Sequence, residues 1–225
     1  MGGQACVFYG GAEFSRDTDL AVAADDANWQ RLCDALKELE AAGIAVPPGN
    51  PDYLRRGFAV HYRCHHPEAE DMRVDIMSVM RGVDDFAKLW ERRTEIADVD
   101  GTIYPLLSLP DLIQAKKTQR SKDWPMIQRL IEADYALNRR TATPAMVRFW
   151  LQEMRSPALL IELAGEHPAA AREVAVERPL LNLIDAKLQK EIRAAIDDEE
   201  RQERERDRIY WEPLKQELER LRHSR

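Results

Sequence analysis

The sequence predicts an α/β (α+β) protein in which a small mixed β-sheet with flanking helices is followed by an α-helical C-terminal region. Up to about Leu137, short β-rich stretches alternate with stretches whose apolar residues recur at helical spacing. Beyond that point the β-rich stretches stop, and one helical pattern follows another. We therefore expect a sheet-containing domain over residues 1–137 and a helical region over residues 138–225.

Four stretches of the first part are predicted to be strands, because they are short, apolar and rich in β-branched or aromatic residues. They cover residues 19–22, 58–63, 73–79 and 103–107. The turn-like sequence His66-Pro67-Glu68 separates the second stretch from the third. We therefore expect these two strands to pair as a β-hairpin.

Three helices are predicted between and after these strands. The first covers residues 29–39, with an aspartate at 25–26 as its N-cap and Gly43 as its stop. The second covers residues 84–93, and the third begins at Ser108, whose hydroxyl can cap it.

The second part is predicted to be entirely helical. Three helices begin at Thr143-Pro144, Ser156-Pro157 and His167-Pro168, because proline suits the first turn of a helix. Residues 180–222 form one long helical pattern interrupted by Pro213. Residues 197–208 are almost all charged, with the two signs interleaved. This pattern favours a solvated helix with i,i+4 ion pairs, and a partner-binding arm is the alternative.

The composition excludes several classes of protein. No apolar run approaches the roughly 20 residues that span a bilayer, and the N-terminus lacks a signal-peptide pattern. The three cysteines are widely spaced and odd in number, as in a cytoplasmic protein with reduced thiols. A net charge of −7 argues against a broad basic field for nucleic acid, so a polynucleotide partner would need a local site.

Carboxylates in two places of the first part suggest metal chemistry. Asp17 and Asp19 point to one face if they lie on a strand, and Gly2-Gly3 precedes them. A helix beginning after the glycines would offer its free N–H groups to a phosphate. Asp75 lies inside an otherwise apolar strand, where a carboxylate is costly unless it faces a metal, a cation or water. Three such carboxylates predict a site for Mg²⁺ or Mn²⁺ bound together with a nucleotide.

These motifs resemble the signature of the polymerase-β-like nucleotidyltransferase superfamily. The matching pattern is Gly2-Gly3, thirteen intervening residues and Asp17-Thr18-Asp19. It is most similar to the small bacterial branch of abortive-infection and minimal nucleotidyltransferases found in toxin–antitoxin systems. A second block, which runs from Leu107 to Asp123, resembles the strand, Lys-bearing helix and Arg-x-Lys-Asp turn of that branch.

The resemblance implies a transfer of a nucleoside monophosphate from an NTP to an acceptor hydroxyl. Asp17, Asp19 and Asp75 would hold the metals, and Asp75 would also help to deprotonate the acceptor. The residues expected near the nucleotide are Gly2, Gly3, Arg16, Lys116, Lys117, Arg120 and Lys122. The acceptor could be a protein, a tRNA end or a small molecule, and a cognate toxin or antitoxin would be a further partner.

Two alternatives stay open beside this reading. Members of the family carry a strand before the Gly-Gly pair, whereas Met1 directly precedes Gly2 here. We therefore expect either a start upstream of Met1 or a degenerate nucleotidyltransferase fold that acts as a binding or regulatory module. A zinc site formed by His61, Cys64, His65 and His66 is the other alternative, although an ordinary hairpin explains their spacing better.

Overall fold

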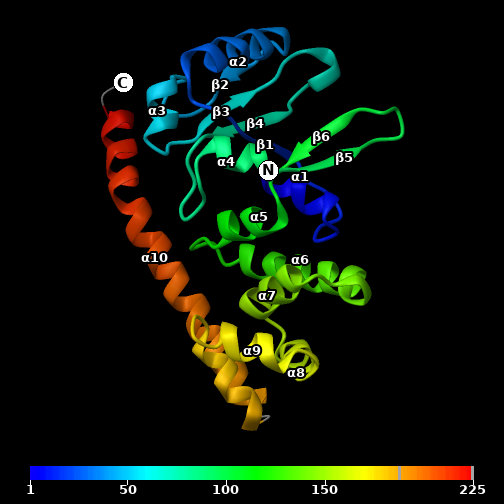
Figure 1. Ribbon diagram of the computed structural model, residues 1–225. Helices are drawn as coiled ribbons and strands as arrows, with labels where there is room; N and C mark the ends of the chain where they lie inside the picture. Colours follow the sequence, from blue (N-terminus) through cyan, green and yellow to red (C-terminus); the bar gives the residue numbers. More distant parts are fainter. Residues whose placement is uncertain (187–188, 224–225) are drawn as a thin grey trace. The chain divides into compact units, whose positions relative to one another are not determined.

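The structure, a computed structural model, describes residues 1–186 and 189–223 and confirms the predicted fold class (Figure 1). A four-stranded mixed sheet with flanking helices is followed by a helical C-terminal region that ends in one long helix. The chain divides into two compact units. We call them the sheet unit (residues 1–8, 12–116 and from 207 onward) and the helical unit (residues 9–11 and 117–206).

The sheet has the strand order β1-β4-β3-β2. Strands β1 (Asp17–Ala21) and β4 (Arg73–Met77) run parallel, whereas β3 (Val60–Arg63) pairs with β4 in antiparallel fashion. The predicted hairpin is thus confirmed as β3–β4, with the 3₁₀ turn η1 (Pro67–Ala69) between its strands. The edge strand β2 (Ala42–Gly43) was not expected, because two residues carry no periodic signal.

One face of this sheet is apolar and packs on α2 (Asp26–Glu38) and α3 (Pro51–Arg55). The core there consists of side chains that alternate along the strands and line the helices, namely Leu36, Leu54, Val60, Cys64, Val74 and Ile76. Asp25 is the N-cap of α2 and accepts a 2.8 Å hydrogen bond from the backbone N–H of Asn28. The predicted stop at Gly43 is wrong. The helix ends at Glu38, and Glu40 makes the turn with a positive φ of 50°, so Gly43 is free to join β2.

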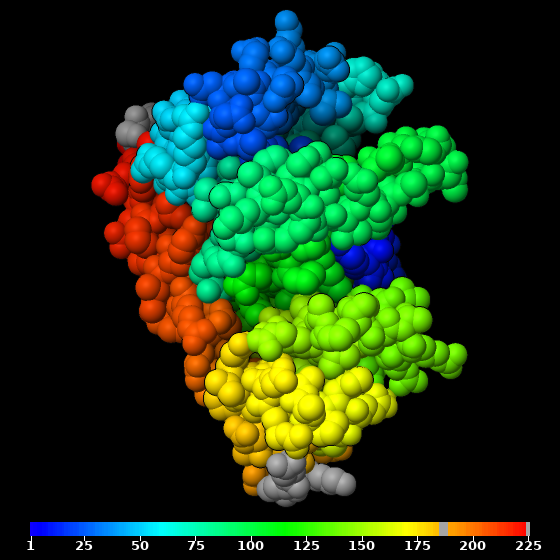
Figure 2. Space-filling model, viewed as in Figure 1, coloured from blue at the N-terminus to red at the C-terminus, as the bar shows by residue number. Residues whose placement is uncertain are grey.

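The rest of the sheet unit consists of short elements that follow the sheet in sequence. Helix α1 (Gly2–Phe8) packs beside β1, and α4 (Phe86–Glu91) leads to a second, two-stranded sheet. That sheet pairs β5 (Thr94–Ala97) with β6 (Ile103–Leu106), of which only β6 was expected. Helix α4 lies at the surface in Figure 2, and its Trp90 is 46% exposed.

Helix α5 (Leu109–Lys116) begins where the sequence predicted it. The backbone N–H of Asp111 donates to the hydroxyl of Ser108 at 3.4 Å. The carboxylate of Asp111 is buried, and it accepts two hydrogen bonds from the guanidinium of Arg92, at 2.6 and 2.7 Å. This bidentate pair fixes the chain that follows α4 to the first turn of α5.

The helical unit contains α6 (Asp123–Asn138), α7 (Pro144–Glu153), α8 (Pro157–Glu166) and α9 (Pro168–Val174), together with 3₁₀ turns at Arg139–Thr141 and Pro179–Ala186. The three Pro-initiated helices begin at the predicted positions. Trp124 and Trp150 are buried in this unit.

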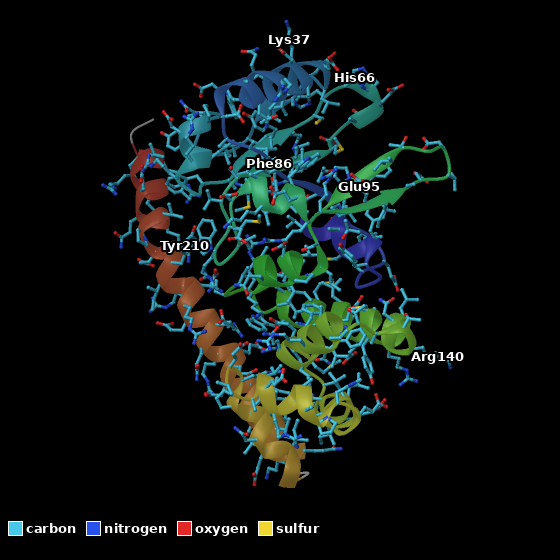
Figure 3. The ribbon with its side chains drawn as sticks, viewed as in Figure 1. Lys37, His66, Phe86, Glu95, Arg140 and Tyr210 are labelled. Carbon is cyan, nitrogen blue, oxygen red and sulfur yellow. The ribbon has the colours of Figure 1, made fainter. Side chains whose placement is uncertain are left out.

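The last helix, α10 (Gln189–His223), contributes to both units and continues through Pro213. Its charged stretch contains local ion pairs such as Arg204–Glu200, which fits the predicted solvated helix. Acids of α10 also have partners on other elements. Glu199 binds Arg178 in the helical unit, and the buried Asp207 binds Arg81 in the sheet unit. Tyr210, labelled in Figure 3, lies one turn further along the helix.

Among the residues that the structure describes, no helix is both long enough and apolar enough to cross a membrane.

Candidate functional site

The candidate site is a row of polar side chains across the middle of the sheet. Asp19 on β1 is the register partner of Asp75 on β4, and Asp75 is in turn opposite His61 on β3. Neighbouring strands lie about 4.8 Å apart, and paired residues project to the same face. The alternation that sends Val74 and Ile76 into the core therefore sends these three side chains to the opposite face. Residues separated by more than 50 positions in sequence come together in this way.

Asp17 lies on the same face, two residues before Asp19 at the start of β1. Its register partner is Arg73, and Arg73 is paired across β4 and β3 with Arg63. The first carboxylate of the Asp-x-Asp pair thus faces a row of arginines, whereas the second faces a carboxylate. The two acids therefore have different electrostatic surroundings, and Asp19 is the one that shares its row with Asp75.

The two glycines lie against Asp19. The backbone N–H of Gly3 donates to Asp19 Oδ2 at 3.1 Å. Gly2 has a positive φ of 65°, and a Cβ added there would lie 1.9 Å from the same oxygen. A Cβ on Gly3 would lie 2.3 Å from Ser15 Oγ. Glycine is therefore required at position 2, where the positive φ and the close approach of Asp19 both exclude a side chain, whereas a side chain at position 3 would have to displace the Ser15 hydroxyl. In this arrangement the Gly3 N–H binds a carboxylate rather than facing open space for a phosphate.

Asp75 has two protein partners that were not anticipated from the sequence. Arg73 Nε and His61 Nδ1 each lie 2.8 Å from Asp75 Oδ1. Arg73 could have been found, because residues two apart on a strand share a face. His61 needed the hairpin register as well, since a shift of one residue would have placed it on the core face.

The two carboxylates in the row have opposite pKa shifts. Burial raises the pKa of Asp19, and the neighbouring charge of Asp75 raises it further, against the lowering effects of the Gly3 N–H and the Lys116 charge. Burial also acts to raise the pKa of Asp75, but hydrogen bonds from His61 and Arg73 outweigh it, and the pKa is lowered. The ionised form of Asp19 is thus destabilised, and a cation bound beside it would reduce this destabilisation.

These shifts predict opposite effects of two substitutions on stability. The raised pKa of Asp19 means that its ionised form opposes folding once the pH exceeds the unfolded value of about 3.9. The lowered pKa of Asp75 means that its ionised form contributes stability, which is lost as the pH falls below about 4. At pH 7 without divalent cations, Asp19→Asn should raise the melting temperature and Asp75→Asn should lower it. Melting curves at pH 7 and pH 3 would check this, and the Asp75→Asn deficit should shrink at pH 3. Two variants that shift in the same direction at pH 7 would contradict the assignment.

The four predicted lysines and arginines of the second block have different surroundings. Lys116, at the end of α5 in the sheet unit, is close enough to Asp19 to act on its charge. Lys117 begins the helical unit, where its ammonium binds Glu153 on α7 at 2.6 Å. Arg120 and Lys122 are exposed residues of the helical unit before α6. Of these four residues, Lys116 alone belongs to the sheet unit and lies near the row of carboxylates.

Arg16 is exposed on the loop that leads into β1. Its guanidinium carbon lies 6.0 Å from the centre of the Phe14 ring, which is 68% exposed. It adjoins Asp17 in sequence, and its side chain is not buried against any core element.

The arrangement can be compared with what a divalent cation needs. Within residues 1–186 and 189–223, no three His, Cys, Asp or Glu side chains come close enough to hold a metal ion. The carboxylates therefore form no closed cage. Asp19 and Asp75 nevertheless fit Mg²⁺ that takes its other ligands from phosphate oxygens and water, since this ion needs only one or two carboxylates from a protein in nucleotide sites.

The same observation applies to the predicted alternative of a zinc site. His61 is bonded to Asp75, Cys64 is buried in the apolar core, and His66 lies beside the 3₁₀ turn between β3 and β4 (Figure 3). The Nδ1 of His66 accepts the N–H of Glu68 as a cap of that turn, at 3.3 Å. These residues belong to an ordinary hairpin, and the described part of the chain brings no zinc-type cluster together.

No protein-family model matches this chain, and no curated protein matches it in sequence.

Proposed function

We propose that this protein is a Mg²⁺-dependent nucleotidyltransferase, which moves a nucleoside monophosphate from an NTP to an acceptor hydroxyl. The observation that carries the proposal is the pairing of Asp19 with Asp75 on adjacent parallel strands, with the two glycines at the start of α1 packed against Asp19. Asp19 and Asp75 are neighbouring carboxylates that repel each other, and the pKa of Asp19 is raised. Such a pair is suited to a shared cation.

The reaction needs few groups from the protein. The acceptor oxygen attacks the α-phosphorus, the bond between the α-phosphorus and the bridging oxygen breaks, and pyrophosphate leaves with the bonding electrons. When bound, a divalent cation would neutralise charge and lower the pKa of the acceptor hydroxyl, whose proton would pass to solvent water. Asp19 and Asp75 would hold the cation, and Asp17 would bind from the adjacent row. Lys116 would lie near the phosphates. Because its pKa is lowered, Asp75 is a weak base, so we assign it to the cation rather than to the acceptor's proton.

Calorimetry would test this proposal without knowledge of the acceptor. Each NTP is titrated into the protein with Mg²⁺ and, separately, with EDTA. We expect saturable heat with at least one NTP only when Mg²⁺ is present. An absence of metal-dependent heat with all four NTPs would contradict the enzyme proposal.

A second function is favoured by the hydrogen bonds that Asp75 already accepts from other residues of the protein. Its Oδ1 already accepts hydrogen bonds from Arg73 and His61, so the charge of this carboxylate is largely compensated by the protein itself. Such compensation suits a catalytically degenerate nucleotidyltransferase fold that acts as a binding or regulatory module. A cognate toxin or antitoxin would be its partner, as in the systems that the sequence resembles. The same titrations separate the two functions, because a module of this kind would give no metal-dependent heat.

A further inference from the structure

His61 has a specific contact that the proposed function does not use. Its side chain is 24% exposed, and its Nδ1 lies 2.8 Å from Oδ1 of Asp75, whose side chain is 16% exposed. The two residues are register partners on the antiparallel strands β3 and β4. Both project to the polar face of the sheet, so the imidazole is not part of the apolar core on the other side.

The chemistry of the partners fixes the proton on this imidazole. An ionised carboxylate only accepts hydrogen bonds, so the nitrogen that faces it must carry the hydrogen. Nδ1 is therefore protonated, and in the neutral ring Nε2 is not. The terminal nitrogen of Arg73 lies 3.4 Å from Nδ1, but both are donors, so this contact is a consequence of their shared acceptor.

Both donors bind the same oxygen of Asp75. Arg73 Nε and His61 Nδ1 approach Oδ1 from β4 itself and from β3, and no hydrogen bond to Oδ2 occurs among the described residues. Two donors on one oxygen restrict rotation of the carboxylate and leave the other oxygen available. Partners of this kind commonly orient a carboxylate ligand and set its affinity for a metal.

We propose that His61 is a positioning residue, which holds Asp75 through an Nδ1–H···Oδ1 hydrogen bond so that Oδ2 is the oxygen presented to the cation. The inference rests on the proposed function for the identity of the cation. The hydrogen bond and its tautomer, however, can be measured without any enzyme activity.

Two substitutions at His61 separate positioning from packing. In His61→Asn the side-chain amide nitrogen is bonded to Cγ, as Nδ1 is in histidine, so a donor remains near Oδ1. In His61→Leu the volume is similar but the donor is lost. His65→Leu is the matched control, because His65 follows the same strand but its side chain is exposed and makes no described hydrogen bond.

We expect His61→Leu to raise the Mg²⁺ concentration needed for half-maximal ATP binding by about 10- to 100-fold. His61→Asn should recover most of this loss, and His65→Leu should leave the requirement unchanged. A purely structural role would make the Asn and Leu variants equal, and that result would overturn the inference. A wild-type Mg²⁺ requirement in His61→Leu would overturn it as well.

A spectroscopic measurement distinguishes failure of this inference from failure of the proposed function. Nitrogen-15 NMR of the imidazole should show His61 as the Nδ1–H tautomer in the metal-free protein, and Asp75→Ala should abolish that preference. If the tautomer is found but no NTP binds with Mg²⁺, the proposed function fails and the hydrogen bond stands. If His61 is the Nε2–H tautomer, the positioning inference fails whatever the protein binds.

Discussion

Replacement of Asp17 and Asp19 together by asparagine is expected to raise the apparent Kd for ATP in the presence of Mg²⁺ by about 10²-fold or more. Loss of groups that only orient metal ligands costs about 10- to 100-fold, so loss of the ligands themselves should cost at least as much. Asparagine keeps the shape of the side chain and can still accept the Gly3 N–H that now binds Asp19. The loss would therefore reflect charge, which calorimetry with ATP and Mg²⁺ would measure.

A control is available on another surface of the same unit. Asp34 on α2 is exposed, and within the described residues its side chain is bonded only to Gln30, one turn away on the same helix. Asp34→Asn removes one negative charge without touching the row and should leave the Kd unchanged. If the double variant at positions 17 and 19 binds ATP as the wild type does, these aspartates are not metal ligands.

The largest expected effect on stability lies in the helical unit, at Arg178. Its side chain is 6% exposed and donates to the carbonyl oxygens of Leu151 and Met154, at 2.8 and 3.0 Å. It also binds Glu199 on α10 at 2.9 Å. One guanidinium thus satisfies the last carbonyls of α7 and ties α10 to that helix. Arg178→Ala would leave these acceptors buried without a donor, and we expect a loss of about 3–5 kcal/mol in the free energy of unfolding of this unit.

Hydrogen exchange would localise this effect. Amides of α7 should lose protection in Arg178→Ala, whereas Arg172→Ala should have little effect, because Arg172 is exposed on α9. Arg178→Lys should recover only part of the loss, since an ammonium cannot reproduce the planar, multiply donating guanidinium. Unchanged protection of α7 in Arg178→Ala would show that the contacts of Arg178 contribute little.

The elements that could be predicted from sequence are those with strong local signals. The hairpin β3–β4 combined two β-rich runs with a Pro-containing turn, and α7, α8 and α9 each carried a proline in the first turn. The end of α2 could not be predicted, because the turn used the non-glycine residue Glu40, and strand β2 could not be predicted, because its two residues carry no periodic signal. Strand β5 was also missed, because it is short and its pairing with β6 leaves no clear pattern in the sequence.

The site shows the same division between local and long-range information. That Asp17 and Asp19 share a face follows from strand alternation alone, and Asp75 stood out as a charge within an apolar strand. The placement of Asp75 beside Asp19 depends on parallel pairing of β1 with β4, which brings together positions 56 residues apart. The partners His61 and Arg73 depend on the register of that same sheet. The sequence pattern also did not distinguish Lys116 from Lys117. In the structure, Lys116 lies near Asp19, whereas Lys117 binds Glu153.

We propose that a metal–nucleotide complex binds at the row formed by Asp19 and Asp75. Paramagnetic broadening by Mn²⁺ in the presence of ATP tests it most directly, because the broadening falls steeply with distance from the ion. We expect the amide signals of β1 and the centre of β4 to broaden first, and the signals of His66 and Asp34 to persist. Broadening that depends on ATP but is centred away from these strands, or no broadening at all, would contradict the claim.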